Sequence, residues 1–168
     1  MRLAVTGTPG TGKTTATDIL ESDLDVVHLN ELIRREGLYT EVDEQRESVV
    51  ADLDAVATRL ETKDDVVVDS HLSHYLDVDE VVVLRCEPDE LERRLRRRGA
   101  SAAKAEENAE SEALDVILSE AVHRHGEEHV YEIDTTDRSP EEVSAVIERV
   151  IAGDERPSAG TVDFTGYL

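Results

Sequence analysis

The sequence predicts an α/β domain of three layers, in which a parallel five-stranded sheet carries helices on both faces. Short runs of β-branched residues alternate along the chain with amphipathic stretches, as they do where helices join parallel strands. A glycine-rich turn leads from the first run into a helix, and a later run ends on Asp69. Ligands of open α/β sheets bind at such carboxyl ends of strands. The 168 residues suffice for one domain with a buried core.

Each expected element rests on its periodicity and on capping residues. Strands are expected at residues 2–6, 25–29, 66–69, 80–85 and 129–133. Helices are expected at residues 13–20, 31–36, 46–61, 88–97, 102–124 and 140–151. Asn30 could cap the second helix, Pro88 favours the start of the fourth, and Ser139 with Glu142 would cap the last. Gly99 separates the fourth helix from the fifth.

The chain is strongly acidic, with 40 acidic against 18 basic residues, a net charge of −22 and 3% aromatic residues. Such a composition also occurs in disordered chains, but the regular apolar patterns favour a folded domain. We therefore expect a halophilic protein whose self-repulsion is screened by a salt-rich cytosol. Because naked nucleic acid and anionic membranes are also negative, neither is expected as a partner, whereas a basic protein could be one.

A cytoplasmic location is expected for this chain. Its single cysteine, Cys86, excludes an intrachain disulfide and is expected to be a small core residue. The N-terminus passes directly into a strand without a signal peptide, and no apolar run reaches the length of a membrane span.

Residues 7–14 match the phosphate-binding P-loop pattern G-x-x-x-x-G-K-T in full, with a strand before it and a helix after it. In such a loop the glycines let backbone N–H groups surround phosphate oxygens, and the helix points its positive end at the anion. Lys13 would reach the β- and γ-phosphates, the Thr14 hydroxyl would hold Mg²⁺, and Thr15 could contact the α-phosphate. The sequence therefore predicts ATP and Mg²⁺ as ligands.

A second acidic site is expected where the apolar run 66–68 ends at Asp69. Asp69 would orient Mg²⁺ directly or through water, although an acid at this position could also simply end the strand. Two residues later, His71 could touch the γ-phosphate or position a water molecule. The alternative for His71 is a partly buried polar side chain in a loop.

Arginines are prominent in a chain that has so few cations. Arg34 and Arg35 lie on the helix after the second strand, and five more arginines end the fourth helix between residues 93 and 98. Positive charge around the transferred group is the main catalytic device of phosphoryl transfer. Most of the second cluster is expected to pair with nearby acids at the helix end. Arg98, next to Gly99, is expected to act from a short closing lid.

Nucleoside monophosphate kinases share this layout of P-loop, acceptor-binding segment and late lid. We expect the acceptor-binding segment at about 28–51 and the lid at about 97–107, within a single domain of residues 1–152. A tail of residues 153–168, with three glycines and Pro157, is expected to be flexible.

Three chemistries remain open at this stage. A monophosphate acceptor is already ionised near neutral pH, so that a kinase of this class needs no strong base, and none is evident. An ATP hydrolase would need a residue that orients water, for which His71 is the candidate. A kinase for a hydroxyl acceptor, such as shikimate or a nucleoside, would need a carboxylate base, for which Glu31 or Asp43 could serve.

Taken together, the motifs resemble the atypical adenylate kinases usually called isoenzyme six. The resemblance rests on residues 6–15, Asp69-x-His71, Arg98-Gly99, and Glu107-Asn108 with Glu110 and Glu112, and it spans roughly residues 1–151. It implies a broad-specificity nucleoside monophosphate kinase whose main reaction is ATP + AMP ⇌ 2 ADP, with a side ATPase activity. It also implies a role in late maturation of the small ribosomal subunit, through contact with one of its basic platform proteins.

The resemblance also implies roles for particular residues. The ATP-binding residues would be Gly10, Gly12, Lys13, Thr14 and Thr15. Arg98 would contact ATP from the lid and complete a catalytic set with Lys13, Asp69 and His71. Thr14 and Asp69 would hold the metal, and Arg34 would bind the acceptor phosphate. Members of that family commonly place an aromatic residue after the lid Arg-Gly, whereas this chain has Ala100, so that base stacking by that route is absent.

Overall fold

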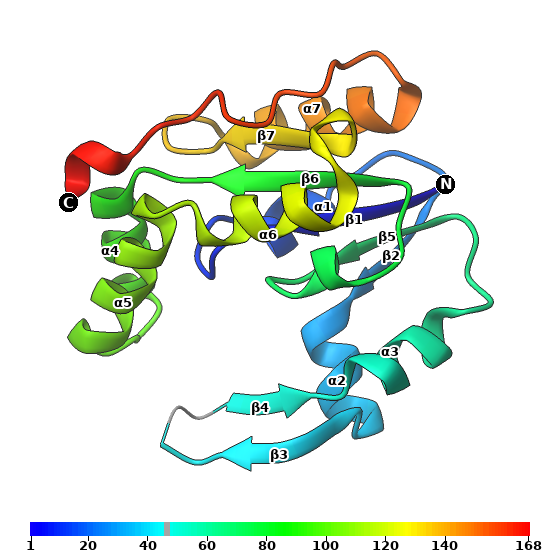
Figure 1. Cartoon of the computed structure of the whole chain (residues 1–168), viewed down its shortest axis with the longest axis horizontal. Helices are drawn as coiled ribbons and strands as arrows, with labels where there is room; N and C mark the ends of the chain where they lie inside the picture. The colour runs from blue at the N-terminus through cyan, green and yellow to red at the C-terminus, as the bar shows by residue number, and fades with distance from the viewer. Residues whose placement is uncertain (46–47) are drawn as a thin grey trace.

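The computed structural model describes residues 1–45 and 48–168, and Figure 1 shows a parallel sheet with helices on both faces. The five strands of this sheet stand in the order β2-β5-β1-β6-β7, and all neighbouring pairs are parallel. Their bounds are Arg2–Thr6 (β1), Asp25–His28 (β2), Val66–Asp69 (β5), Glu80–Arg85 (β6) and Val130–Asp134 (β7). The expected fold class and all five expected strands are therefore confirmed, with ends that differ by at most one residue.

Seven helices are found in the part of the chain that the structure describes. Their bounds are Lys13–Thr17 (α1), Leu29–Glu36 (α2), Leu53–Leu60 (α3), Pro88–Arg97 (α4), Ala102–Ala113 (α5), Val116–His125 (α6) and Pro140–Ala152 (α7). Short 3₁₀ turns lie at Ser73–Tyr75, Glu127–His129 and Thr165–Tyr167. None of the described helices combines the length and the apolar character that crossing a membrane requires.

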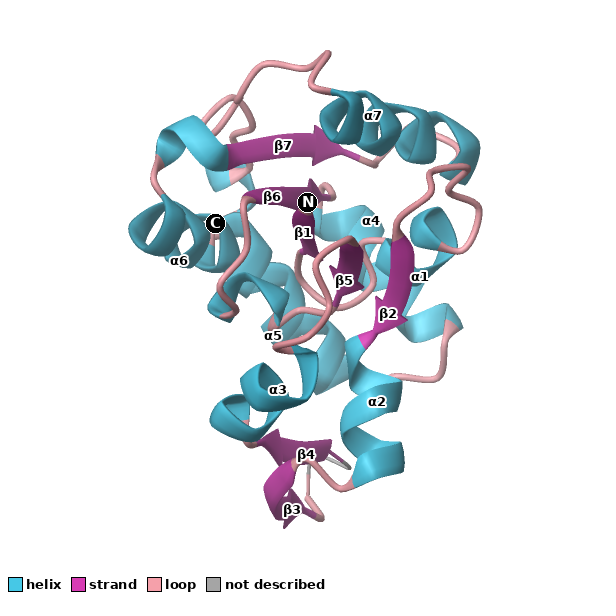
Figure 2. Ribbon diagram, turned by 90° about the vertical axis from the view of Figure 1, so that its right-hand side faces the viewer, coloured by secondary structure: helices cyan, strands magenta, loops and turns pink. Residues whose placement is uncertain are grey.

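The three layers follow from the alternation of side chains along the strands. On β1, Leu3 and Val5 face a core cluster that includes Ala16 of α1 and Ile147 of α7, whereas Ala4 faces the opposite side. There the sheet is covered by α6 near β6 and β7, and by α2 and α3 near β5. Figure 2 shows the sheet between α1 and α7 on one face and α6, α2 and α3 on the other. Because both faces are covered, the central strands are apolar between their ends, at residues 3–5, 66–68 and 81–84.

Helices α4 and α5 form a hairpin beyond the carboxyl ends of the strands (Figure 1). The turn between them spans residues 98–101, which is where the lid is expected. Ala100 is partly buried there against a cluster that contains Leu91, Leu95 and Ala105. The residue that replaces the usual aromatic thus packs inside the hairpin.

The expected helix at residues 46–61 is wrong in its first half. Residues 46 and 47 lie outside the described part of the chain, and Ser48–Ala51 (β4) pairs antiparallel with Tyr39–Asp43 (β3). The β-branched Val49 and Val50 favour a strand, and Asp52 begins α3 by accepting a hydrogen bond from the Ala55 N–H at 3.1 Å. The expected acceptor segment therefore consists of α2 followed by a hairpin. Asn30 is not the cap of α2 but lies inside it, because the helix begins at Leu29, two residues earlier than expected, with His28 as its cap.

The expected helix at residues 102–124 is divided into α5 and α6. Asp115 separates them in a left-handed conformation with φ 55°. This conformation is uncommon for a residue other than glycine, although Asp tolerates it better than most. The carboxylate of Asp115 reaches the buried Arg85, which accounts for the break.

The tail, which composition predicts to be flexible, contacts the sheet in this structure. Its backbone runs along the edge strand β7, where the Ser158 N–H donates to the Val130 carbonyl oxygen at 3.0 Å. The N–H groups of Gly160 and Thr161 donate to the buried Glu132 side chain. Polar partners on β7, which local composition does not reveal, place this segment against the sheet.

Candidate functional site

The P-loop joins β1 to α1 at the carboxyl edge of the sheet. Gly7 lies so close to β6 that a Cβ atom on it would meet the Leu84 carbonyl oxygen at 2.6 Å. Gly12 has φ 94° and leads into α1 as its cap. The loop is also held from β7, because the Thr135 hydroxyl donates to the Thr11 carbonyl oxygen at 3.1 Å. Glycine is required at these positions for close approach and for a positive φ.

Lys13 lies inside the loop that it follows. Its Nζ donates to the carbonyl oxygens of Gly7 at 2.8 Å and Thr8 at 3.1 Å. Burial lowers the pKa of Lys13 to about 8, against the opposing charges of Asp69 and Glu112. An anion in the loop would favour the charged ammonium group, so this lysine suits a phosphate ligand.

Asp69 ends β5 next to the P-loop helix and is only 4% exposed. Its Oδ2 accepts hydrogen bonds from the Thr17 hydroxyl and from His28 Nδ1, the latter at 2.7 Å. None of the described hydrogen bonds ends on its Oδ1. The Thr14 hydroxyl, one turn before Thr17, belongs to an exposed residue.

The oxygen donors at this edge fit Mg²⁺ bound together with a nucleotide. Within residues 1–45 and 48–168 there is no group of three or more His, Cys, Asp or Glu side chains that could hold a metal ion alone. Mg²⁺ with a nucleotide does not need one, since phosphates and waters supply most of its six ligands. Thr14 and Asp69 can supply one hydroxyl and one carboxylate oxygen.

His28 is a site residue that the sequence patterns do not single out. Its Nε2 donates to Asp18 Oδ1 at 2.7 Å, while its Nδ1 is bound to Asp69. Burial alone would lower the pKa of His28, but its hydrogen bonds to the two carboxylates raise it overall. Both ring nitrogens donate, so the geometry favours the imidazolium form. His28 thus ties the start of α2 to α1 and β5.

His71 lies next to the phosphate loop in a half-buried position. Burial, together with the nearby charge of Lys13, lowers the pKa of His71 to about 4. Its imidazole is therefore neutral at physiological pH and can accept a proton or a hydrogen bond. The preceding Ser70 donates from its hydroxyl to Asn30 Oδ1 at 2.8 Å, which links this loop to α2. Arg34 is one turn beyond Asn30 on the same face of that helix.

The arginines of α4 divide into two kinds. Those at positions 93, 94, 96 and 97 pair with Glu90 or Glu92 at 2.8–4.0 Å. Among the described residues, Arg98 alone of this cluster has no carboxylate within salt-bridge distance. It is exposed at the end of α4, and its charge contributes to the lowered pKa of Lys13. The expected lid arginine is therefore the one that is available near the P-loop lysine.

A buried polar cluster beneath the loop is not predicted by the sequence. Glu112 accepts from the Thr8 hydroxyl at 3.0 Å, from the Cys86 N–H at 2.8 Å and from Arg85 Nε at 3.2 Å. Burial raises the pKa of Glu112, against the opposing effect of Arg85. Two signals could have indicated this cluster: Glu112 is among the residues that carry the family resemblance, and an arginine ends the otherwise apolar run 81–84.

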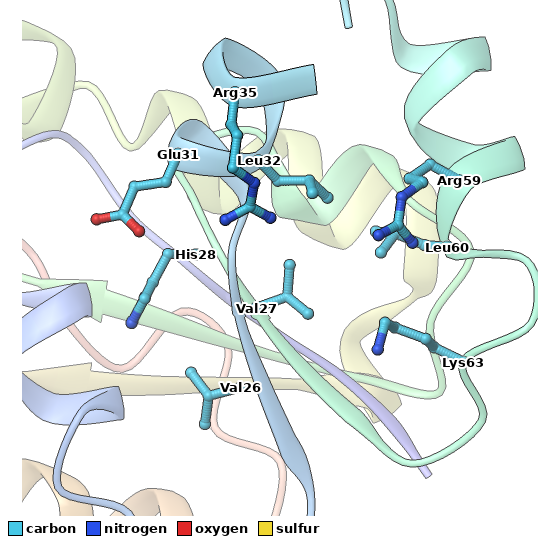
Figure 3. Close-up of a pocket in the computed structure, with 9 residues that line it drawn as sticks. All are labelled: Val26, Val27, His28, Glu31, Leu32, Arg35, Arg59, Leu60 and Lys63. Carbon is cyan, nitrogen blue, oxygen red and sulfur yellow. The ribbon is translucent and has the colours of Figure 1, made fainter. Parts of the chain in front are cut away.

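A separate cationic pocket of about 230 Å³ lies along the edge strand β2. In Figure 3, Arg35 of α2, Arg59 of α3 and Lys63 point into the space beside Val27. Arg59 is held by Glu36 at 2.7 Å. None of the predicted ATP-binding residues lines this pocket, but His28, which is hydrogen-bonded to Asp69, and Glu31 of α2 do, so that the pocket adjoins the acceptor side of the candidate site.

Comparison with known families gives a match to the AAA domain over residues 3–115. A protein from Natronomonas pharaonis named "Putative adenylate kinase" is 63% identical over the full length of both chains. Proteins of the same name from Halobacterium salinarum and Methanosarcina acetivorans are 60% and 47% identical; the first match covers both chains fully, and the second covers 90% of this chain and 86% of that protein.

Solved structures share the fold at low sequence identity. A shikimate kinase from Acinetobacter baumannii in complex with shikimate has a TM-score of 0.65 at 14% identity, with 92% of this chain and 94% of that chain covered. A deoxyadenosine kinase from M. mycoides with bound dATP has a TM-score of 0.59 at 12% identity, with 90% and 100% covered.

Proposed function

The chain belongs to the AAA domain family and to the family of archaeal proteins named "Putative adenylate kinase". On this basis we propose that it is a nucleoside monophosphate kinase. Its reaction would be ATP + AMP ⇌ 2 ADP with Mg²⁺, and other monophosphates would also be accepted. The enzyme is thus a nucleotide kinase whose donor site is the P-loop and whose acceptor site is formed by α2 and the hairpin β3–β4.

The observation that carries the proposal is a hydrogen-bonded connection between the two sites. Thr17 of α1 and His28 at the start of α2 bind the same carboxylate oxygen of Asp69. Ser70, the next residue, binds Asn30 of α2. The helix that would hold the acceptor is therefore fixed against the helix that follows the P-loop. Phosphoryl transfer depends chiefly on such relative positioning.

In the proposed transfer, an oxygen of the AMP phosphate forms a bond to the γ-phosphorus of ATP. The bond between that phosphorus and the β–γ bridging oxygen breaks, and its electron pair leaves with ADP. The acceptor oxygen is already ionised near neutral pH, so that no side chain has to remove a proton. The imidazole of His71 lies near Lys13 and has a pKa lowered to about 4, which makes it a weak base. A reaction that requires no proton removal is compatible with such a site.

Each side chain would have a positional or electrostatic role. Lys13 would bind the β- and γ-phosphates, and Arg98 would approach the transferred group from the turn between α4 and α5. Arg34 would bind the acceptor phosphate from α2. Mg²⁺, held by Thr14 and Asp69, would neutralise charge that develops on the phosphate oxygens. Backbone N–H groups of Gly10, Gly12 and Thr15 would hold the phosphates on the other side.

A side ATPase activity would use His71. Its neutral imidazole lies near Lys13 and could accept a hydrogen bond from a water molecule that attacks the γ-phosphorus when no acceptor is bound. Replacement of His71 by Ala should then lower hydrolysis more than transfer. Equal losses in both activities would exclude this role.

The decisive experiment supplies ATP and Mg²⁺ with each nucleoside monophosphate in turn, at high salt, and resolves ADP from orthophosphate. ADP formation that depends on an added monophosphate, with AMP the best acceptor, and that exceeds orthophosphate release supports the kinase. Orthophosphate release that ignores every monophosphate would overturn it in favour of an ATPase. A parallel reaction with shikimate tests whether the acceptor is a hydroxyl group. The shikimate kinases share the fold with this chain at 14–19% identity, which does not establish a shared acceptor.

A second role, in late maturation of the small ribosomal subunit, would use a basic ribosomal protein as partner. It follows from the resemblance to the isoenzyme-six kinases, and the net charge of −22 favours such a partner. Affinity purification from cells at their native salt concentration, followed by mass spectrometry, tests it. Absence of every small-subunit protein from the purified material would exclude a stable complex.

A further inference from the structure

We propose that the C-terminal segment, residues 158–168, is a positioning element of the nucleotide site that holds the P-loop through Arg85, Glu112 and Thr8. The inference rests on the proposed function, since it concerns the same ATP site. It assigns a role to a segment that lies outside the P-loop, the acceptor helix and the lid.

The first link joins the loop to α5. Thr8, 3% exposed, donates from its hydroxyl to Glu112 Oε1 at 3.0 Å, and the other carboxylate oxygen of Glu112 accepts the Cys86 N–H at 2.8 Å. Glu112 is itself 3% exposed. One buried carboxylate therefore fixes the second residue of the P-loop to the end of β6. A hydrogen bond to a buried charge is stronger than a neutral one and sharply defined in direction.

The second link is Arg85, whose side chain is buried. It contacts Glu112 at 3.2 Å, Asp115 at 2.5 Å and Glu132 at 2.9 Å. A single guanidinium thus serves three carboxylates. Because one positive charge cannot neutralise three negative ones, the position of Arg85 depends on what else binds those carboxylates.

The third link is the tail. Glu132 Oε1 accepts the backbone N–H groups of Gly160 and of Thr161, the second at 3.0 Å. The ring of Phe164 lies 5.4 Å from the guanidinium carbon of Arg85. The 3₁₀ turn that ends the chain then packs against α5, the helix that carries Glu112. The tail therefore supplies donors to one carboxylate of the cluster and covers its arginine.

The consequence of losing the tail follows from these contacts. Without the two N–H donors, Glu132 would depend more on Arg85 and would draw the guanidinium away from Glu112. Glu112 would then lose part of its support, and its bond to Thr8 would weaken. The P-loop would remain folded but would be less well positioned, so that the cost should appear in nucleotide affinity.

The test measures the Kd for ADP by calorimetry in high salt, at a temperature where circular dichroism shows each variant to be folded. Variants are Phe164→Ala, a chain that ends at Pro157, Thr8→Val, and Thr8→Val combined with each tail change. Matched controls are Leu168→Ala, which changes an exposed side chain of the same tail, and Thr58→Val, which removes a hydroxyl on α3.

We expect Thr8→Val and the shortened chain each to raise the Kd about tenfold, Phe164→Ala about threefold, and the controls less than about twofold. In the Thr8→Val background the tail changes should add little, because they act through the bond already removed. Full additivity, or tail variants that melt earlier but bind ADP normally, would overturn the inference. If the shortened chain fails to fold, Phe164→Ala decides. A wild-type protein that does not bind ADP would refute the proposed function instead.

Discussion

The Nδ1 atom of His28 donates a hydrogen bond to Asp69 Oδ2 at 2.7 Å and so joins the acceptor segment to the candidate Mg²⁺ ligand. Replacing His28 by Ala removes this bond and the one to Asp18, so that the bond between Ser70 and Asn30 is left to hold α2 at the P-loop edge. We expect the KM for AMP to rise about threefold to tenfold, with a smaller change in the KM for ATP.

Steady-state kinetics with either substrate varied would measure both constants for the His28→Ala variant. His123→Ala is the matched control, because His123 is exposed at the end of α6. A variant in which the KM for ATP alone changes would contradict an anchoring role for His28 at the acceptor site.

Lys13 should impose an upper pH limit on nucleotide capture. Burial lowers its pKa to about 8, so that the free enzyme loses the ammonium charge as the pH rises through that value. We expect kcat/KM for ATP to fall above about pH 8, approaching a tenfold loss per pH unit. At saturating ATP the bound phosphates should favour the charged form and move the decline of kcat to higher pH. Constant kcat/KM up to pH 10 would contradict this assignment.

Two neighbouring arginines at the end of α4 allow a direct comparison of a functional and a structural role. Arg98→Ala should lower kcat/KM about tenfold to a hundredfold, because the side chain would contact the transferred phosphate. Arg97→Ala should change it less than about twofold, since Arg97 is exposed and weakly paired with Glu90 at 4.0 Å. Equal effects of the two substitutions would show that the lid has no specific arginine.

Stability should depend strongly on salt because the net charge is −22. Screening of like charges should raise the melting temperature by about 5–10 °C between 0.1 M and 2 M KCl at pH 7. The same comparison at pH 5, nearer the pI of about 4.5, should give a smaller rise because fewer carboxylates are charged. A salt effect that is equal at both pH values would point to surface exclusion of the salt rather than to screening.

Local sequence determined the fold class and the donor side of the site. The P-loop depends on residue types at fixed spacing, and the positive φ of Gly12 is a backbone requirement that is local in the chain. The buried strand Val66–Asp69 is an apolar run of strand length that ends in an acid. Such features are predictable because the interactions that fix them involve neighbours in sequence, or one uniform core.

Tertiary structure decided the contacts between distant segments. Whether residues 48–51 form a helix or a strand depended on β3 as a pairing partner, and the break at Asp115 depended on an arginine 30 positions earlier. The ring of His28 reaches Asp69 only because β2 lies beside β5. The tail contacts Glu132 of β7, a partner about 30 residues earlier in the chain. A polar side chain in the sequence does not reveal its partner, because hydrogen bonds and ion pairs in a buried site are selected by the packing of elements far apart in the chain.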